Sequence, residues 1–196
     1  MIELSLNEVE ALAAKVARGA GFPWGLADDI GRAARALAMR GAPWAEALLA
    51  LARHAGDFEP PSPERAARWR RGEMDLPSDI PLCPVRTAAL LTDTGLALGA
   101  EPLRLERVGL PIWIEGLLAA AGPAWHDIEI RGDALSFSAA VAISPAAQGA
   151  VPARVPRATI ALDLLADLNV IAGRVYVPES ERSRARGAGG GTVDEE

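Results

Sequence analysis

The chain has 196 residues, a formal net charge of −6 and one cysteine, Cys83. This length is sufficient for a single compact domain that buries about 70% of the surface its unfolded chain would expose, and a lone cysteine excludes an intrachain disulfide. Because affinity for nucleic acid comes mainly from cationic contacts to phosphate, the negative charge argues against a nucleic-acid partner.

Membrane association is not expected either. The most apolar stretch, residues 111–121, is interrupted by Glu115 and is too short to span a bilayer. Residues 1–8 lack the basic region of a signal peptide and lead directly into a helical pattern. We therefore expect a cytoplasmic protein.

The first predicted element is a helix that begins after Ser5 and ends near Arg18. Ser5 and Glu8 have the spacing of a capping box, and apolar residues follow at helical intervals. Gly19 is the expected C-cap, because glycine tolerates the backbone conformation with which many helices end.

A sharp corner is predicted between this helix and a second helix that extends to Arg40. Glycine and proline punctuate the corner, and Trp24 is expected in the turn, where a small polar residue would be more usual. Asp28 and Asp29 are expected in the first turn of the second helix, where the helix dipole favours carboxylates.

A third helix is expected between Pro43 and Gly56, which completes an antiparallel bundle in residues 1–72. Ser62 then caps a short helix in which four arginines surround Trp69. These are Arg65, Arg68, Arg70 and Arg71. Arginine interleaved with an aromatic residue can bind nucleic acid, but in an acidic protein we favour a solvated helix face.

Residues 73–178 are predicted to form an α+β region. Residues 87–91 fit either a helix or a strand, whereas alternating apolar residues predict a strand over residues 103–106. A strongly apolar helix follows over residues 111–121 and is ended by glycine and proline.

A β-hairpin is predicted around the Gly132-Asp133 turn, with its second strand over residues 135–143. Residues 157–162 are expected to add a third strand. A final helix ends at Gly173.

The predicted fold is therefore α+β, with an N-terminal antiparallel helical bundle followed by a small, mostly antiparallel sheet with two packing helices. A tail rich in serine, arginine and glycine is expected over residues 179–196. We expect these regions to form one compact domain.

Familiar catalytic motifs are not found in the sequence. Gly19, Gly21 and Gly25 follow a helix, whereas a dinucleotide-binding turn follows a strand. Cys83 has no histidine near it in sequence, and we interpret it as a half-buried loop thiol. No cofactor can be assigned.

A metal site is not expected, because His54 and His126 both have ordinary positions, at a helix end and a strand start. Asp163 and Asp167 lie four residues apart on one predicted helix and could share a cation. Paired carboxylates on an outer helix face are the commoner arrangement.

The strongest candidate for chemistry is the C-terminal block that follows Tyr176. It combines hydroxyl, guanidinium and glycine N–H groups, from which cradles for carboxylate or phosphate are built. The residues concerned are Ser180, Ser183, Arg184, Gly187 and Gly189. The alternative interpretation is a charged tail without a site.

The sequence resembles a family of small bacterial proteins of unknown function. The resemblance rests on Ser-Leu-Asn-Glu at residues 5–8, on Arg-Gly-Ala-Gly at 18–21 with Trp-Gly-Leu-Ala at 24–27, and on the C-terminal motifs that begin with Tyr176. It implies no activity, but it implies that both glycine-rich blocks are family hallmarks.

Two functions follow as hypotheses. In the first, the protein binds a small anionic metabolite, with catalysis left open, in a hollow where Arg18, Gly21 and Trp24 face the C-terminal block from Tyr176 to Gly189. In the second, it is an accessory subunit or homodimer whose apolar helices, including residues 111–121, pack on a protein partner.

Overall fold

The computed structural model of the chain describes residues 1–73, 75, 78–93, 102–122, 126–145 and 154–176. Its helices are α1 (Leu6–Gly19), α2 (Trp24–Met39), α3 (Trp44–Arg53), α4 (Pro63–Arg70), α5 (Pro84–Asp93), α6 (Ile112–Ala121), α7 (Leu162–Ala172) and the short 3₁₀ helix η1 (Gly173–Val175). Its strands are β1 (Ile2–Ser5), β2 (Leu103–Val108), β3 (His126–Arg131), β4 (Ala139–Pro145) and β5 (Arg157–Ile160). The predicted α+β class is confirmed.

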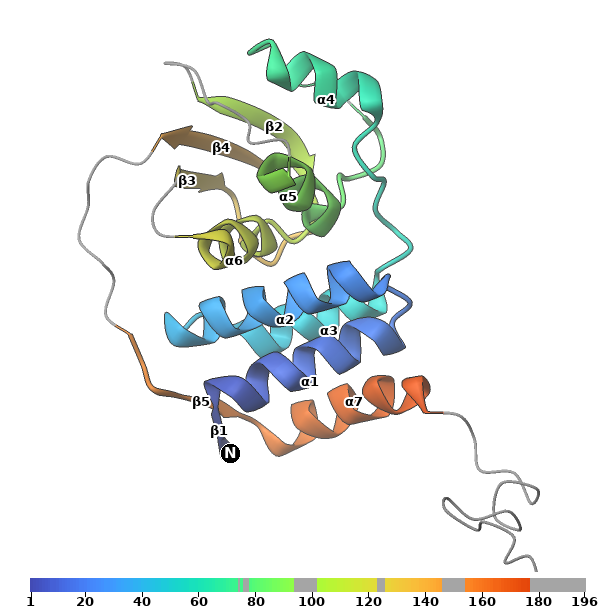
Figure 1. Ribbon diagram of the computed structural model, residues 1–196, viewed down its shortest axis with the longest axis vertical. Coiled ribbons are helices and arrows are strands. Elements are labelled where there is room, and N and C mark those ends of the chain that lie inside the picture. The colour runs from blue at the N-terminus through green and yellow to red at the C-terminus, as the bar shows by residue number, and fades with distance from the viewer. Residues whose placement is uncertain (74, 76–77, 94–101, 123–125, 146–153, 177–196) are drawn as a thin grey trace, which may run out of the picture.

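The elements are stacked in layers along the long axis of the molecule (Figure 1). Helix α7 packs on α1, α1 packs on α2 and α3, and α2 packs on the pair α5 and α6. The three-stranded sheet lies beyond this pair, and α4 lies at the far end. A helix from the end of the chain thus covers the helix at its beginning.

The N-terminal bundle forms as its sequence predicts. Ser5 N–H donates to the Glu8 carboxylate at 2.7 Å and Glu8 N–H donates to Ser5 Oγ at 3.2 Å, which is the predicted capping box. The hydrogen bond from the Ser5 backbone lowers the pKa of Glu8. One face of α1 is buried at Val9, Ala13 and Val16.

Gly19 is the last residue of α1 and not its C-cap, which is Ala20. A Cβ atom at Gly19 would lie 2.0 Å from the carbonyl oxygen of Ile171 in α7, so the glycine permits close packing of the two helices. The left-handed backbone conformation expected at Gly19 occurs instead at Gly21, which has φ +93°.

The main sheet has the strand order β2-β4-β3, and both pairs are antiparallel. The predicted β3–β4 hairpin is confirmed, but β4 begins at Ala139 and not at residue 135. The third strand of the main sheet is β2, whereas β5 pairs with β1 in a separate two-stranded sheet. The prediction for β5 was wrong because a short alternating pattern gives a strand but not its partner.

The apolar helix α6 packs against both α2 and α5. Trp113 is fully buried, and its indole N–H donates to the carbonyl of Ala47 in α3 at 3.2 Å. Residues 87–91, which were ambiguous, belong to α5. None of the helices in the described ranges combines the length and the apolar character needed to cross a bilayer.

Helix α4 is anchored through three residues that we call the buried trio, Arg65, Trp69 and Asp75. The Asp75 carboxylate accepts from Arg65 Nε at 2.9 Å, from Arg65 Nη2 at 3.1 Å and from Trp69 Nε1 at 3.0 Å. It also accepts from the N–H of Glu106 in β2 at 3.2 Å. The predicted solvated face was therefore wrong for Arg65 and Trp69, which fasten α4 to the sheet.

Candidate functional site

The corner between α1 and α2 is closed by its own backbone. The N–H groups of three successive residues donate back into the last turn of α1. These bonds are Ala20 to Val16 at 2.9 Å, Gly21 to Arg18 at 3.0 Å and Phe22 to Ala17 at 3.0 Å. Phe22 is 9% exposed and anchors the corner in the core.

Trp24 is the first residue of α2 and not a turn residue, since the first helical hydrogen bond runs from Ala27 N–H to the Pro23 carbonyl at 2.9 Å. Asp28 and Asp29 consequently lie beyond the first turn in which they were expected. In this position Asp28 lies within reach of Arg18 in the last turn of α1.

Arg18, Trp24 and Asp28 form a second group, which we call the exposed trio. The guanidinium carbon of Arg18 lies 4.1 Å from the centre of the Trp24 ring, a cation–π contact. Arg18 Nη2 donates to Asp28 Oδ1 at 2.6 Å. The Trp24 residue is 68% exposed, so its other ring face is open to solvent.

The charge of Arg18 is therefore already opposed by Asp28, a partner that sequence reasoning missed. Asp28 engages Nη2, and among the described residues the buried Nε of Arg18 has no hydrogen-bonding partner. An ion pair that is 26% and 48% exposed contributes at most about 1 kcal/mol, so a competing anion can exchange with Asp28 at low cost.

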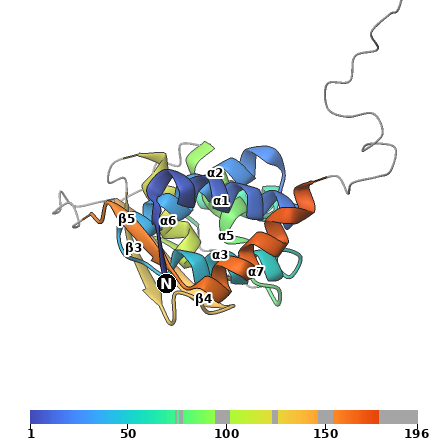
Figure 2. The same cartoon turned by 90° about the horizontal axis from the view of Figure 1, so that it is seen from below.

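Tyr176 lies at the same end of the bundle as the corner. The short helix η1 packs against α1, and both views show the end of α7 beside the α1–α2 corner (Figures 1 and 2). Tyr176 follows η1 and is 65% exposed. The other predicted site residues lie outside the described residues, and they are Ser180, Ser183, Arg184, Gly187 and Gly189.

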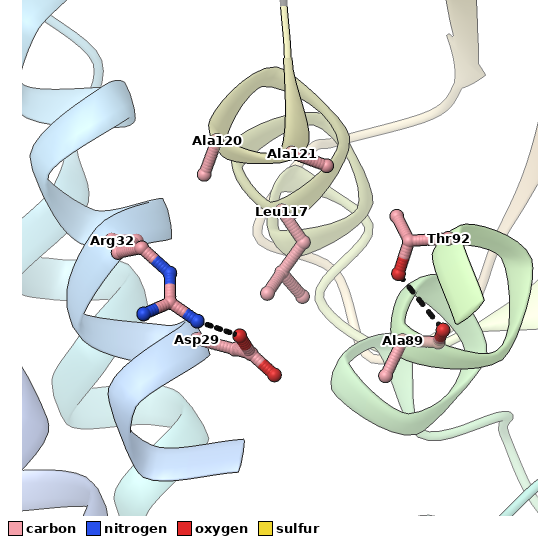
Figure 3. Close-up of a pocket in the computed structure, with 7 residues that line it drawn as sticks. All are labelled: Asp29, Arg32, Ala89, Thr92, Leu117, Ala120 and Ala121. Carbon is pink, nitrogen blue, oxygen red and sulfur yellow. Dashed lines mark hydrogen bonds and ion pairs between the residues drawn. The ribbon is translucent and has the colours of Figure 1, made fainter. Parts of the chain in front are cut away.

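A groove of about 110 Å³ lies between α2, α5 and α6 (Figure 3). Asp29 and Arg32 of α2 form an ion pair on one side, and Thr92 of α5 lies on the other. The remaining lining is apolar and consists of Ala89, Leu117, Ala120 and Ala121. No local pattern in the sequence indicated this groove, because helices distant from one another in the chain build it.

The other candidate residues have structural roles. Trp69 is 3% exposed and cannot stack on a base, which removes the basis of the nucleic-acid interpretation of α4. Cys83 is 3% exposed, more buried than expected, and burial raises the pKa of its thiol. Such a thiol is a poor nucleophile.

His54 and the paired carboxylates also have ordinary partners. His54 Nδ1 lies 2.7 Å from Asp57 Oδ2, and His126 begins β3. Asp167 pairs with Arg53 of α3 at 2.9 Å, while Asp163 accepts from the N–H of Leu164. Within the described ranges, three or more histidine, cysteine or carboxylate side chains do not gather in a possible metal site.

Residues 4–76 match the model of a family described as a protein of unknown function (DUF3726). The match agrees with the resemblance to a family of unknown function, and it includes the capping box, the exposed trio and the buried trio. The C-terminal motifs of the resemblance lie outside it. No curated protein and no solved structure matches the chain.

Proposed function

We infer that this protein binds a small anionic metabolite at the α1–α2 corner. The observation that carries the inference is the exposed trio, in which a guanidinium lies on one face of a tryptophan ring that is 68% exposed. Large aromatic side chains at exposed positions commonly serve recognition. A planar ring beside a guanidinium offers both an apolar wall and a charged donor.

The chemistry of the trio favours an anion with a flat or apolar part. The flat part stacks on the open face of Trp24. The anionic group displaces the Asp28 carboxylate from the guanidinium of Arg18 and pairs with it instead. Arginine donates two parallel N–H groups to carboxylate or phosphate, which gives such a contact its geometry. The open position of Trp24 beside this cation supports the assignment.

The C-terminal block is the proposed second half of the site. Tyr176 lies at the corner end of the bundle and is 65% exposed, which supports this arrangement. In the proposal, Ser180, Ser183, Arg184 and the N–H groups of Gly187 and Gly189 add hydrogen bonds to the anion.

To test the proposal, each anion of a panel is added to the full chain, and its binding is measured by thermal melting and by calorimetry. We expect one or more of inorganic phosphate, pyrophosphate, citrate and AMP to raise the melting temperature. Arg18→Gln, Trp24→Ala and truncation after Pro178 should each abolish that rise. A panel without any effect, or full binding by the three variants, would contradict the proposal.

Arg40→Gln is the matched control. Arg40 also forms a half-exposed ion pair, with Glu115 at 2.7 Å, but it lies at the opposite end of α2. We expect this variant to bind like the natural chain. A loss of binding in this control as well would indicate a general charge effect and not a site at the corner.

The alternative hypothesis is an accessory subunit or homodimer. It rests on the 50% hydrophobic content and on the apolar residues 111–121, of which Ile112, Trp113, Ile114, Leu117 and Leu118 are buried inside the chain. A strict monomer in light scattering is the result we expect. A stable oligomer at micromolar concentration would favour the alternative.

A further inference from the structure

The groove between α2, α5 and α6 combines three kinds of surface within a small volume (Figure 3). A carboxylate and a guanidinium lie side by side on α2, a hydroxyl lies opposite on α5, and an apolar floor is formed mainly by α6. The groove and the exposed trio share no residue, although Asp28 and Asp29 are neighbours in sequence.

The acceptor side of the groove has unused capacity. Asp29 Oδ1 accepts from Arg32, whereas Asp29 Oδ2 has no hydrogen-bonding partner within the described part of the chain. The Thr92 hydroxyl directs its proton toward the carbonyls of Ala89 at 2.8 Å and Ala88 at 3.1 Å, so its lone pairs can accept. Two acceptors on facing walls suit an ammonium group.

The donor side is equally accessible. Arg32 and Asp29 are 53% and 36% exposed at the mouth of the groove, and their ion pair costs little to rearrange. A lone amine in the groove would lie close to the Arg32 cation, and a lone carboxylate would lie close to Asp29. A ligand that carries both charges pairs with both side chains and leaves neither unpaired.

The floor and the volume limit the rest of the ligand. Leu117 is 6% exposed, and the alanines around it present methyl groups. For comparison, an engineered apolar cavity of about 150 Å³ holds benzene. A volume of about 110 Å³ therefore accepts a short aliphatic group together with its ammonium, while a carboxylate stays at the exposed mouth.

We propose that this groove binds a small aliphatic amino acid. Its ammonium lies between Asp29 and Thr92, its carboxylate meets Arg32, and its side chain rests on Leu117. The site differs from the corner in position and in ligand class. Failure of either proposal leaves the other intact, because Arg18 and Trp24 line one site and Asp29 and Arg32 line the other.

The test compares L-alanine with its two halves, ethylamine and propionate, by NMR titration of the isotope-labelled full chain. We expect alanine to bind at least tenfold more tightly than either half. The shifted amides should belong to α2, α5 and α6 around the groove. Equal affinity for alanine and either half, or shifts located elsewhere, would overturn the proposal.

Two substitutions at the groove should produce opposite preferences for the anionic and the cationic half of alanine. Asp29→Asn leaves Arg32 without its carboxylate, so this variant should lose alanine binding at least tenfold and prefer propionate over ethylamine. Arg32→Gln should show the opposite preference. An unchanged order of the three ligands in both variants would also overturn the proposal.

The controls are Glu10→Gln and Arg35→Gln. Arg35 and Glu10 form an ion pair at 3.1 Å with exposures of 45% and 36%, close to those of Arg32 and Asp29, but outside the groove. Both variants should bind alanine within twofold of the natural chain. A tenfold loss in either control would show that surface charge, and not the groove, governs the binding.

Discussion

Two groups in this protein contain the same three residue types, and their burial is opposite. In the buried trio, Arg65 and Asp75 are 6% and 0% exposed, and Trp69 donates to the carboxylate. In the exposed trio, Arg18 and Asp28 are 26% and 48% exposed, and Trp24 lies under the guanidinium. In both groups the arginine and the aspartate are 10 residues apart.

The difference shows how environment decides what an arginine–aspartate pair does. Removing one partner of a buried pair leaves the other charge in a low-dielectric interior, whereas water and salt screen an exposed pair. Arg65 and Asp75 are therefore committed to holding α4 against β2. Arg18 and Asp28 contribute little to stability, so they can exchange partners with a ligand.

The largest expected effect comes from Asp75→Asn. This change removes the fully buried one of the two carboxylates that pair with Arg65, while Glu59 remains, and we expect a loss of about 3 kcal/mol in the free energy of unfolding. Urea denaturation measures it. Replacing both partners by apolar residues, Arg65→Met with Asp75→Leu, should recover part of the lost stability. If Asp75→Asn alone proved as stable as the natural chain, the buried trio would not have the structural role described.

An intermediate effect is expected at Cys83, which reports on the region around the buried trio. Its N–H donates to the carbonyl of Glu59 at 2.7 Å, and the Glu59 carboxylate pairs with Arg65. Because burial raises the pKa of the thiol, disulfide reagents at pH 8 should label it slowly in the native protein.

Asp75→Asn should accelerate this labelling by about tenfold or more, since the local structure over the thiol opens more often. Asp28→Asn should leave the rate unchanged. Equal rates in both variants would contradict the role of the buried trio in keeping Cys83 inaccessible.

The smallest effect is expected from Asp28→Asn itself. An exposed ion pair of this kind contributes less than about 1 kcal/mol, so the midpoint of urea denaturation should hardly move. The loss should shrink further at high salt, which screens exposed charges. A loss comparable to that of Asp75→Asn would show that the exposed trio is also a determinant of the fold.

Local patterns in the sequence predicted much of the fold. The capping box at Ser5, the end of α2 near Arg40, the cap at Ser62 and the hairpin of β3 and β4 depend on interactions between residues close in the chain. The corner was predicted for the same reason, although Trp24 was placed in the turn and not at the start of α2.

Local patterns could not predict the contacts between segments that are distant in the chain. The pairing of β1 with β5, the packing of α7 on α1 and the burial of Arg65 depend on which surfaces meet after folding. The groove was missed because α2, α5 and α6 each contribute only part of it. No single segment carries its donors, acceptors and floor together.

The sequence by itself determined where the helices and hairpin form, because periodicity, caps and turn residues act within a few residues of each other. Only the tertiary structure decided which of two arginine–aspartate–tryptophan groups is buried. That choice depends on the sheet that β2 forms with β4, and on the Glu106 N–H that this sheet presents to Asp75.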